Sequence, residues 1–187
     1  ARDLLGQVER RRGWFVAGKF DQVQGDTPHS AFVQAASELI RLLLTGSEQS
    51  LERWGQRLQE ALGAQGQALV DLLPDLELII GPQPAATELP PEEAAFRLSG
   101  LFCALARELT SSGQPLVVFL DDLQWAGGSS LKLAEALLAD DQIHHLLLLG
   151  AADADDSGQL TLALEAMRQG PAEVNILPLE PLDVGPI

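Results

Sequence analysis

The chain has 187 residues, a formal net charge of −15 and 46% hydrophobic residues, which suits one domain with a buried core. A surface this acidic repels phosphate backbones and anionic lipids, which argues against nucleic-acid or membrane-surface binding as the main role. Helix-forming residues dominate and aromatics make up only 5%, which argues against a β-sandwich.

The sequence also indicates a reducing compartment. Cys103 is the single cysteine, so no internal disulfide can form, and its apolar surroundings favour a packing role. The N-terminal residues do not read as a signal peptide. The apolar run around Leu146–Leu149 is too short to span a bilayer. We therefore expect a soluble, cytoplasmic protein.

The N-terminal third begins with a helix, a strand and a second helix. We expect a short helix over residues 3–12 that ends at Gly13, followed by a buried strand over Trp14–Ala17. Thr27 can act as the N-cap of the next helix, with Pro28 at its first helical position.

The middle of the chain reads as helical with one irregular stretch. Residues 47–73 predict one helix or a pair, because Gly63 and Gly66 weaken the centre. Prolines predict irregular structure over residues 74–91. A helix then restarts at Pro90 and runs to about residue 109.

Strands and helices alternate in the C-terminal third. This alternation predicts right-handed crossovers and a doubly wound α/β sheet. The expected elements are a strand over Leu116–Leu120, a helix over Ser130–Leu138 capped by Ser129, a strand over His145–Leu149, a helix over Leu160–Met167 and a strand over Val174–Leu177.

The strongest chemical signal is the apolar run Leu116–Leu120 followed by Asp121 and Asp122. Ligands of open α/β sheets bind at the carboxyl ends of the strands. Two acids at that place are costly unless a cation or a reaction uses them. The pattern suits the Walker B motif of P-loop ATPases, in which the acids serve Mg²⁺ and the attacking water. Taken alone, it also fits a strand that runs into a capped turn.

Longer stretches resemble one family. The segment Leu120–Ala126, followed by Ser130–Leu133, resembles the AAA-like ATPase domain of the STAND class found in large bacterial serine/threonine–histidine hybrid kinases. Three more segments match the same family: Gly13–Gln22, Pro28–Ala35 and Ile79–Pro84. The resemblance covers nearly the whole chain. It implies a single P-loop NTPase-like domain over residues 1–187, a three-layer α/β fold with a helical insert at about 28–112.

The resemblance also assigns roles to residues. It implies that Asp121 is the magnesium-side acid and Asp122 the catalytic-side acid, and that Gln124 and Trp125 lie on the nucleotide side. The implied cofactors are Mg²⁺ and ATP. No Ser or Thr follows Lys19, so we expect a solvated loop lysine there and not the P-loop lysine.

Two departures from the family pattern concern the nucleotide. The Walker A loop and its strand would lie before Ala1, so we expect this chain alone to lack the first strand and to bind little ATP. The family's Gly-Ala-Tyr-Arg-Asp reads Gly150-Ala151-Ala152-Asp153-Ala154 here, without the tyrosine and arginine. We expect Asp153, Asp155 and Asp156 to form a solvated acidic loop.

Three functions remain open at this point. The chain is an ATP-binding regulatory module of a signalling protein, a degenerate scaffold that binds no nucleotide, or a plain acidic interaction domain. Kinase or sensor domains of the same polypeptide or pathway are the expected partners. The resemblance implies the strand order 5-1-4-3-2. Without strand 1, we expect the fifth strand to pair directly with the fourth; the alternatives are self-association through the exposed edge and a domain that stays partly molten near its C-terminus.

Overall fold

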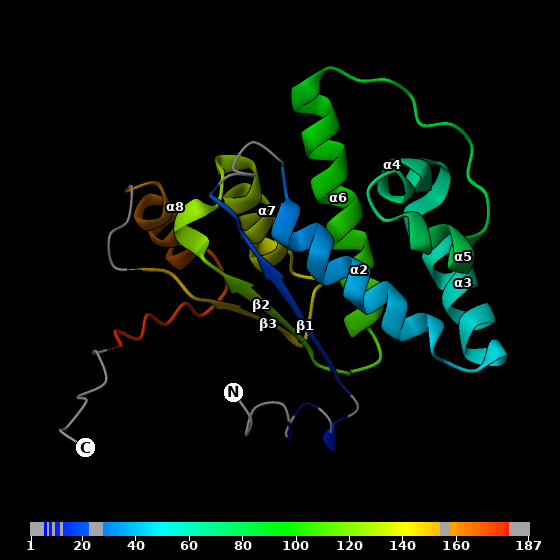
Figure 1. The fold of residues 1–187 in the computed structure, drawn as a ribbon, viewed down its shortest axis with the longest axis horizontal. Coiled ribbons are helices and arrows are strands. Elements are labelled where there is room, and N and C mark those ends of the chain that lie inside the picture. Colours follow the sequence, from blue (N-terminus) through cyan, green and yellow to red (C-terminus); the bar gives the residue numbers. More distant parts are fainter. Residues whose placement is uncertain are drawn as a thin grey trace.

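The protein is a mixed α/β fold, as the sequence predicts, and it is built on a three-stranded parallel sheet (Figure 1). The computed structural model describes residues 6, 8, 10, 11, 13–22, 28–153 and 158–179. The strands are β1 (Trp14–Lys19), β2 (Leu116–Asp121) and β3 (Leu146–Gly150), in the order β1-β2-β3. This order agrees with the 4-3-2 part of the sheet that the family resemblance implies.

The central strand β2 is apolar because helices cover the face formed by its alternate residues. Leu116, Val118 and Leu120 point into the main core, where Val16 of β1 joins them. Leu116 and Leu120 are 4% and 3% exposed. The flanking strand β3 is less enclosed, and its Leu147 is 42% exposed.

Helix α2 (Ser30–Leu44) covers β1 closely. A Cβ atom on Gly18 would run into the carbonyl group of Ala31, so only glycine permits this approach. Side chains of α2 also close the outer edge of β1. Glu38 accepts the backbone N–H of Ala17, and Gln34 accepts that of Lys19, both at 3.0 Å. These bonds satisfy donors that an edge strand would otherwise leave open.

The remaining residues between β1 and β2 are largely helical, and the predicted break at Gly63 is confirmed. They form α3 (Glu48–Leu62), α4 (Gly66–Val70), α5 (Glu77–Ile80) and α6 (Pro91–Thr110), with 3₁₀ turns at Gly63–Gln65 and Pro74–Leu76. The Ser47 hydroxyl accepts the N–H of Ser50 at the start of α3. Gly63, at φ 55°, ends that helix. The irregular stretch predicted over 74–91 is partly wrong, because Pro74 starts a helical turn.

Two further helices, α7 (Gly128–Ala139) and α8 (Gln159–Arg168), flank β3 in the chain and pack together. The predicted cap of α7 is wrong, because Gly127 is the N-cap and Ser129 lies inside the helix. The neighbouring Ser130 is buried instead, and its hydroxyl accepts the backbone N–H of His29 at 3.1 Å.

The start of α2 differs from the prediction. The predicted cap Thr27 lies outside the described residues, as does most of the predicted helix over residues 3–12. His29 is the N-cap of α2, in the left-handed region at φ 61°, and is 2% exposed. Burial lowers the pKa of its imidazole.

The predicted fifth strand and its pairing with the fourth are wrong. Residues 173–179 form no strand, and in the described part of the chain β3 pairs with β2 alone. Val174 packs against the core, whereas Ile176 and Leu177 are 53% and 81% exposed. Pro178 has no N–H to donate to a ladder, which disfavours strand pairing at this place.

The structure also bears on the predictions for membrane insertion and for the cysteine. Of the helices described here, none has the length and apolar character needed to cross a bilayer.

Cys103 is buried in α6, and burial raises the pKa of its thiol to about 11. The thiol therefore stays protonated and inert at neutral pH.

Candidate functional site

Asp121 and Asp122 lie where the carboxyl end of the central strand meets the loop before α7 (Figure 1). Asp121 is the last residue of β2. Asp122 follows in the left-handed conformation, at φ 55° and ψ 46°, and starts the 3₁₀ turn Leu123–Trp125. Aspartate tolerates this region better than most residues, and such backbone is frequent at functional sites. We call Asp121, Asp122, Lys19, Gln124 and Asp153 the acidic corner.

Lys19 belongs to this corner and lies in a strand, so the prediction of a loop position is wrong, whereas its side chain is 61% exposed, in agreement with a solvated lysine. It is the last residue of β1, and the parallel register places it beside Asp121. Its Nζ lies 2.7 Å from Oδ2 of Asp122 and 3.5 Å from Oδ2 of Asp121. One ammonium group therefore contacts both carboxylates.

The residues before Lys19 carry a misleading spacing. Gly13 and Gly18 are separated by four residues and precede Lys19, as the glycines of a Walker A loop precede its lysine. Phe20 follows where that motif has Ser or Thr. The structure shows a strand over Trp14–Lys19 and not a loop. Lys19 is therefore not a P-loop lysine, as the sequence predicts.

The ion pairs stabilise the charged forms of both partners. The hydrogen bond from Lys19 holds the pKa of Asp122 below its usual range, against a smaller opposing effect of desolvation. The same hydrogen bond raises the pKa of Lys19. The side chains of Asp121 and Asp122 are 40% and 32% exposed, so the corner is open to solvent.

Gln124 connects the ends of β2 and β3. Its Nε2 lies 3.4 Å from Oδ1 of Asp122 and 3.4 Å from Oδ2 of Asp153, and its Oε1 accepts the N–H of Asp153 at 3.2 Å. Asp153 was predicted to be part of a solvated loop, yet it joins the acidic corner; Asp155 and Asp156 lie outside the described residues. The adjacency of the β2 and β3 ends was the signal that could have located it.

Backbone contacts fix this arrangement, and Trp125 stays at its margin. The backbone N–H of Ala151 donates to the carbonyl of Leu120, and that of Leu123 donates to the carbonyl of Ala151. These two hydrogen bonds hold the loop after β2 against the end of β3. Gly150 leaves room for the Leu123 side chain, which a Cβ atom would displace. Trp125 is 40% exposed and donates its backbone N–H to Asp122.

The acidic corner fits a magnesium ion in its donor type and number. Asp121 and Asp122 provide hard oxygen donors that converge on one cation, as their shared contact with Lys19 shows. Oδ1 of Asp121 accepts the N–H of Asp122, which leaves Oδ2 for a ligand. Mg²⁺ keeps most of its waters and binds proteins through one or two carboxylates and substrate phosphates. Among the described residues, no cluster of three or more His, Cys, Asp or Glu side chains could enclose a metal.

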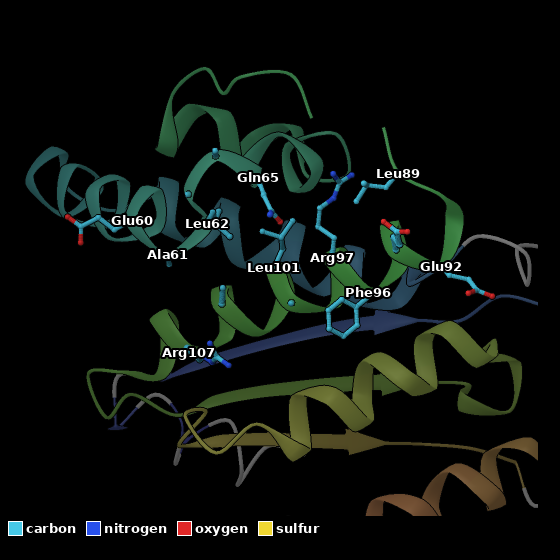
Figure 2. Close-up of a pocket in the computed structure, with 15 residues that line it drawn as sticks. Glu60, Ala61, Leu62, Gln65, Leu89, Glu92, Phe96, Arg97, Leu101 and Arg107 are labelled. Carbon is cyan, nitrogen blue, oxygen red and sulfur yellow. The ribbon is translucent and has the colours of Figure 1, made fainter. Parts of the chain in front are cut away.

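A hollow of the described surface lies elsewhere. It has a volume of about 890 Å³ and lies between the end of α3 and the helix α6 (Figure 2). Leu62 and Leu101 contribute to its apolar lining, and its charged residues are Glu60, Glu92, Glu93, Arg97 and Arg107. It contains none of the residues of the acidic corner. We therefore place the candidate site by its carboxylates and not by the depth of the surface.

Comparison with known proteins agrees with the sequence resemblance. The chain is 37% identical over 124 residues to hybrid signal transduction histidine kinase G of Dictyostelium discoideum. The match covers 66% of this chain and 4% of that kinase, so the chain corresponds to a small part of its relative. No solved structure matches the chain significantly. The family model for the AAA ATPase domain matches residues 1–149, which include β1, β2, both acids and all of β3 except its last residue. The chain therefore belongs to the AAA ATPase domain family.

Proposed function

We propose that this chain is an ATPase-type regulatory module of a multidomain signalling kinase, with the acidic corner as its metal site. One observation supports the proposal most. In a chain of the AAA ATPase domain family, two adjacent carboxylates lie at the carboxyl end of the central parallel strand and converge on one cation. That end of an open α/β sheet is where ligands bind.

The two acids differ in geometry, and this supports different roles. Asp121 is fixed at the end of β2, and one of its oxygens accepts the N–H of Asp122. We assign Asp121 to Mg²⁺, which when bound would neutralise charge on the nucleotide phosphates. Asp122 turns away from the strand in the left-handed conformation. We assign Asp122 to holding and polarising the attacking water, and place Gln124 and Trp125 beside the nucleotide.

We also propose that the 187 residues alone do not hydrolyse ATP. Hydrolysis needs a loop of backbone N–H groups around the β- and γ-phosphates. The one Gly-x-x-x-x-Gly-Lys stretch of this sequence is the strand β1 and cannot provide that loop. The module would then obtain its phosphate contacts from another part of a longer polypeptide.

The proposed partners are kinase or sensor domains of the same polypeptide, because the similar protein is a hybrid histidine kinase many times longer than the match. We propose a cytoplasmic site of action. The second candidate function is a scaffold that binds no nucleotide. The ion pairs of Lys19 favour it, because they neutralise part of the charge that would attract a metal.

Metal binding by the isolated chain tests the proposal. Free Mn²⁺ can be followed by electron paramagnetic resonance as a substitute for Mg²⁺. We expect weak, saturable binding that is lost in Asp121→Asn and kept in Asp141→Asn, which changes an exposed acid elsewhere. Equal binding by both variants would contradict the assignment. Calorimetry with Mg-ATP should show no dissociation constant tighter than millimolar; a micromolar constant would contradict the proposed inactivity.

A further inference from the structure

We propose that Lys19 is a tethered cation that holds the acidic corner closed, and that a divalent metal enters only when Lys19 moves away. The inference rests on the proposed metal site and concerns its regulation. Lys19 would thereby select a metal carried by a polyphosphate over a free metal ion.

The position of Lys19 is set by the backbone. Parallel pairing places its Cα opposite that of Asp121, and its own N–H donates to Gln34 of α2. The tight contact between Gly18 and Ala31 prevents β1 from sliding. The backbone of β1 therefore places the side chain of Lys19 next to Asp121 and Asp122.

The side chain itself can leave. It is 61% exposed, and among the residues that the structure describes its Nζ has no ion-pair partner besides the two acids. Exposed ion pairs of flexible lysines are weak, so a competing cation can displace the ammonium group. The contacts of Nζ are made to Oδ2 of both carboxylates, the oxygens that a metal would use.

Electrostatics decides which metal species can displace Lys19. A free divalent ion meets an ammonium group a few ångströms away, and this repulsion weakens its binding about ten-fold in a water-exposed site at low salt. A metal chelated by a nucleoside polyphosphate brings negative phosphates with it. These offset the repulsion and give the displaced ammonium a new partner. A lysine that closes the corner thus keeps it from filling with free metal.

Mn²⁺ affinity of matched lysine variants tests the inference on the whole chain. The sequence has only two lysines, and Lys132 is exposed in α7, away from the corner. We expect Lys19→Met to bind free Mn²⁺ about ten-fold more tightly than wild type at low salt, with the gain shrinking at 0.5 M KCl. Lys19→Arg keeps the charge and should remain within two-fold of wild type, as should Lys132→Met. Unchanged or weaker binding by Lys19→Met overturns the inference.

Chemical labelling provides a readout that needs no nucleotide. Amine acetylation quantified by mass spectrometry compares Lys19 with Lys132 in one molecule. We expect Lys19 to react several-fold more slowly than Lys132 without metal, and to speed up in Asp122→Asn. Equal rates in the metal-free wild type would overturn the inference.

The two proposals fail in different ways. If Asp121→Asn abolishes Mn²⁺ binding while Lys19→Met leaves it unchanged, the metal site stands and the role of Lys19 is wrong. If neither wild type nor Lys19→Met binds Mn²⁺, both the metal site and the gating role are wrong. Circular dichroism confirms that each variant is folded before binding is measured.

Discussion

Replacing Gly18 by alanine should destabilise the fold and disturb the acidic corner together. The added Cβ would run into the carbonyl oxygen of Ala31 and come within 2.6 Å of its carbonyl carbon and 2.9 Å of its Cα. All three atoms are backbone of α2, so the helix must shift as a unit. Overpacking of this kind costs about 1–3 kcal/mol. The shift also weakens the bonds from Gln34 and Glu38 to β1, at about 1 kcal/mol each.

We therefore expect Gly18→Ala to lower the free energy of unfolding by about 3 kcal/mol or more. Urea denaturation followed by circular dichroism measures this change. The matched control is Gly100→Ala, in the exposed interior of α6, where an added Cβ meets nothing within 4 Å. That substitution should stabilise the protein by about 0.5–1 kcal/mol. A Gly18→Ala variant within 0.5 kcal/mol of wild type would refute the close packing of α2 on β1.

Three further predictions concern titratable groups. The side chain of Asp140 is 6% exposed and pairs with Arg107 at 2.7 Å. Burial is the largest single effect and opposes the charge of Asp140, but the bonds from Arg107, the N–H of Gln142 and the charge of Arg107 together outweigh it and lower the pKa of Asp140. Asp140→Asn should cost about 1–2 kcal/mol at pH 7, and urea midpoints should show the difference fading as the pH falls below about 4, where the carboxyl protonates. Because the pKa of His29 is lowered, the contribution of neutral His29 to the free energy of unfolding is complete above about pH 6.5 and is lost at lower pH. His29→Asn places a residue that tolerates the left-handed backbone, and it should remove the fall in the free energy of unfolding between pH 7 and 5. Cys103, with a pKa of about 11, should resist iodoacetamide at pH 8 until urea unfolds the chain; rapid native labelling would contradict its burial.

Periodicity predicted the elements whose residues face the core. The strands at Leu116–Asp121 and Leu146–Gly150 and the helix starting at Pro91 lie within two residues of their predicted bounds. The apolar residues of β2 and α6 indicate burial directly, whereas β3 is only partly enclosed. The predicted strand at Val174–Leu177 failed because an apolar run indicates burial only if a partner lies beside it. In the structure Ile176 and Leu177 face solvent.

The acids of the candidate site could be located from sequence, but their neighbours could not. Asp121 and Asp122 follow a recognisable buried strand. Lys19 and Asp153 stand 102 and 32 residues away from Asp121 in the sequence, and only the order and register of the strands bring them to the same corner. Lys19 looked like a loop residue because Gly18 ends the apolar run before it and a polar stretch begins at Asp21, whereas pairing with β2 extends β1 to include it.

Paramagnetic broadening by Mn²⁺ in the amide spectrum of the isotope-labelled chain tests the central claim most directly, because it reports where the metal binds. At low Mn²⁺ concentrations we predict that signals of Lys19, Asp121, Asp122, Gln124 and Asp153 broaden first, and that Asp121→Asn abolishes this pattern. Broadening centred on other acids, such as Glu92 and Glu93 at the start of α6, or broadening that persists unchanged in Asp121→Asn, would contradict a metal site at the end of β2.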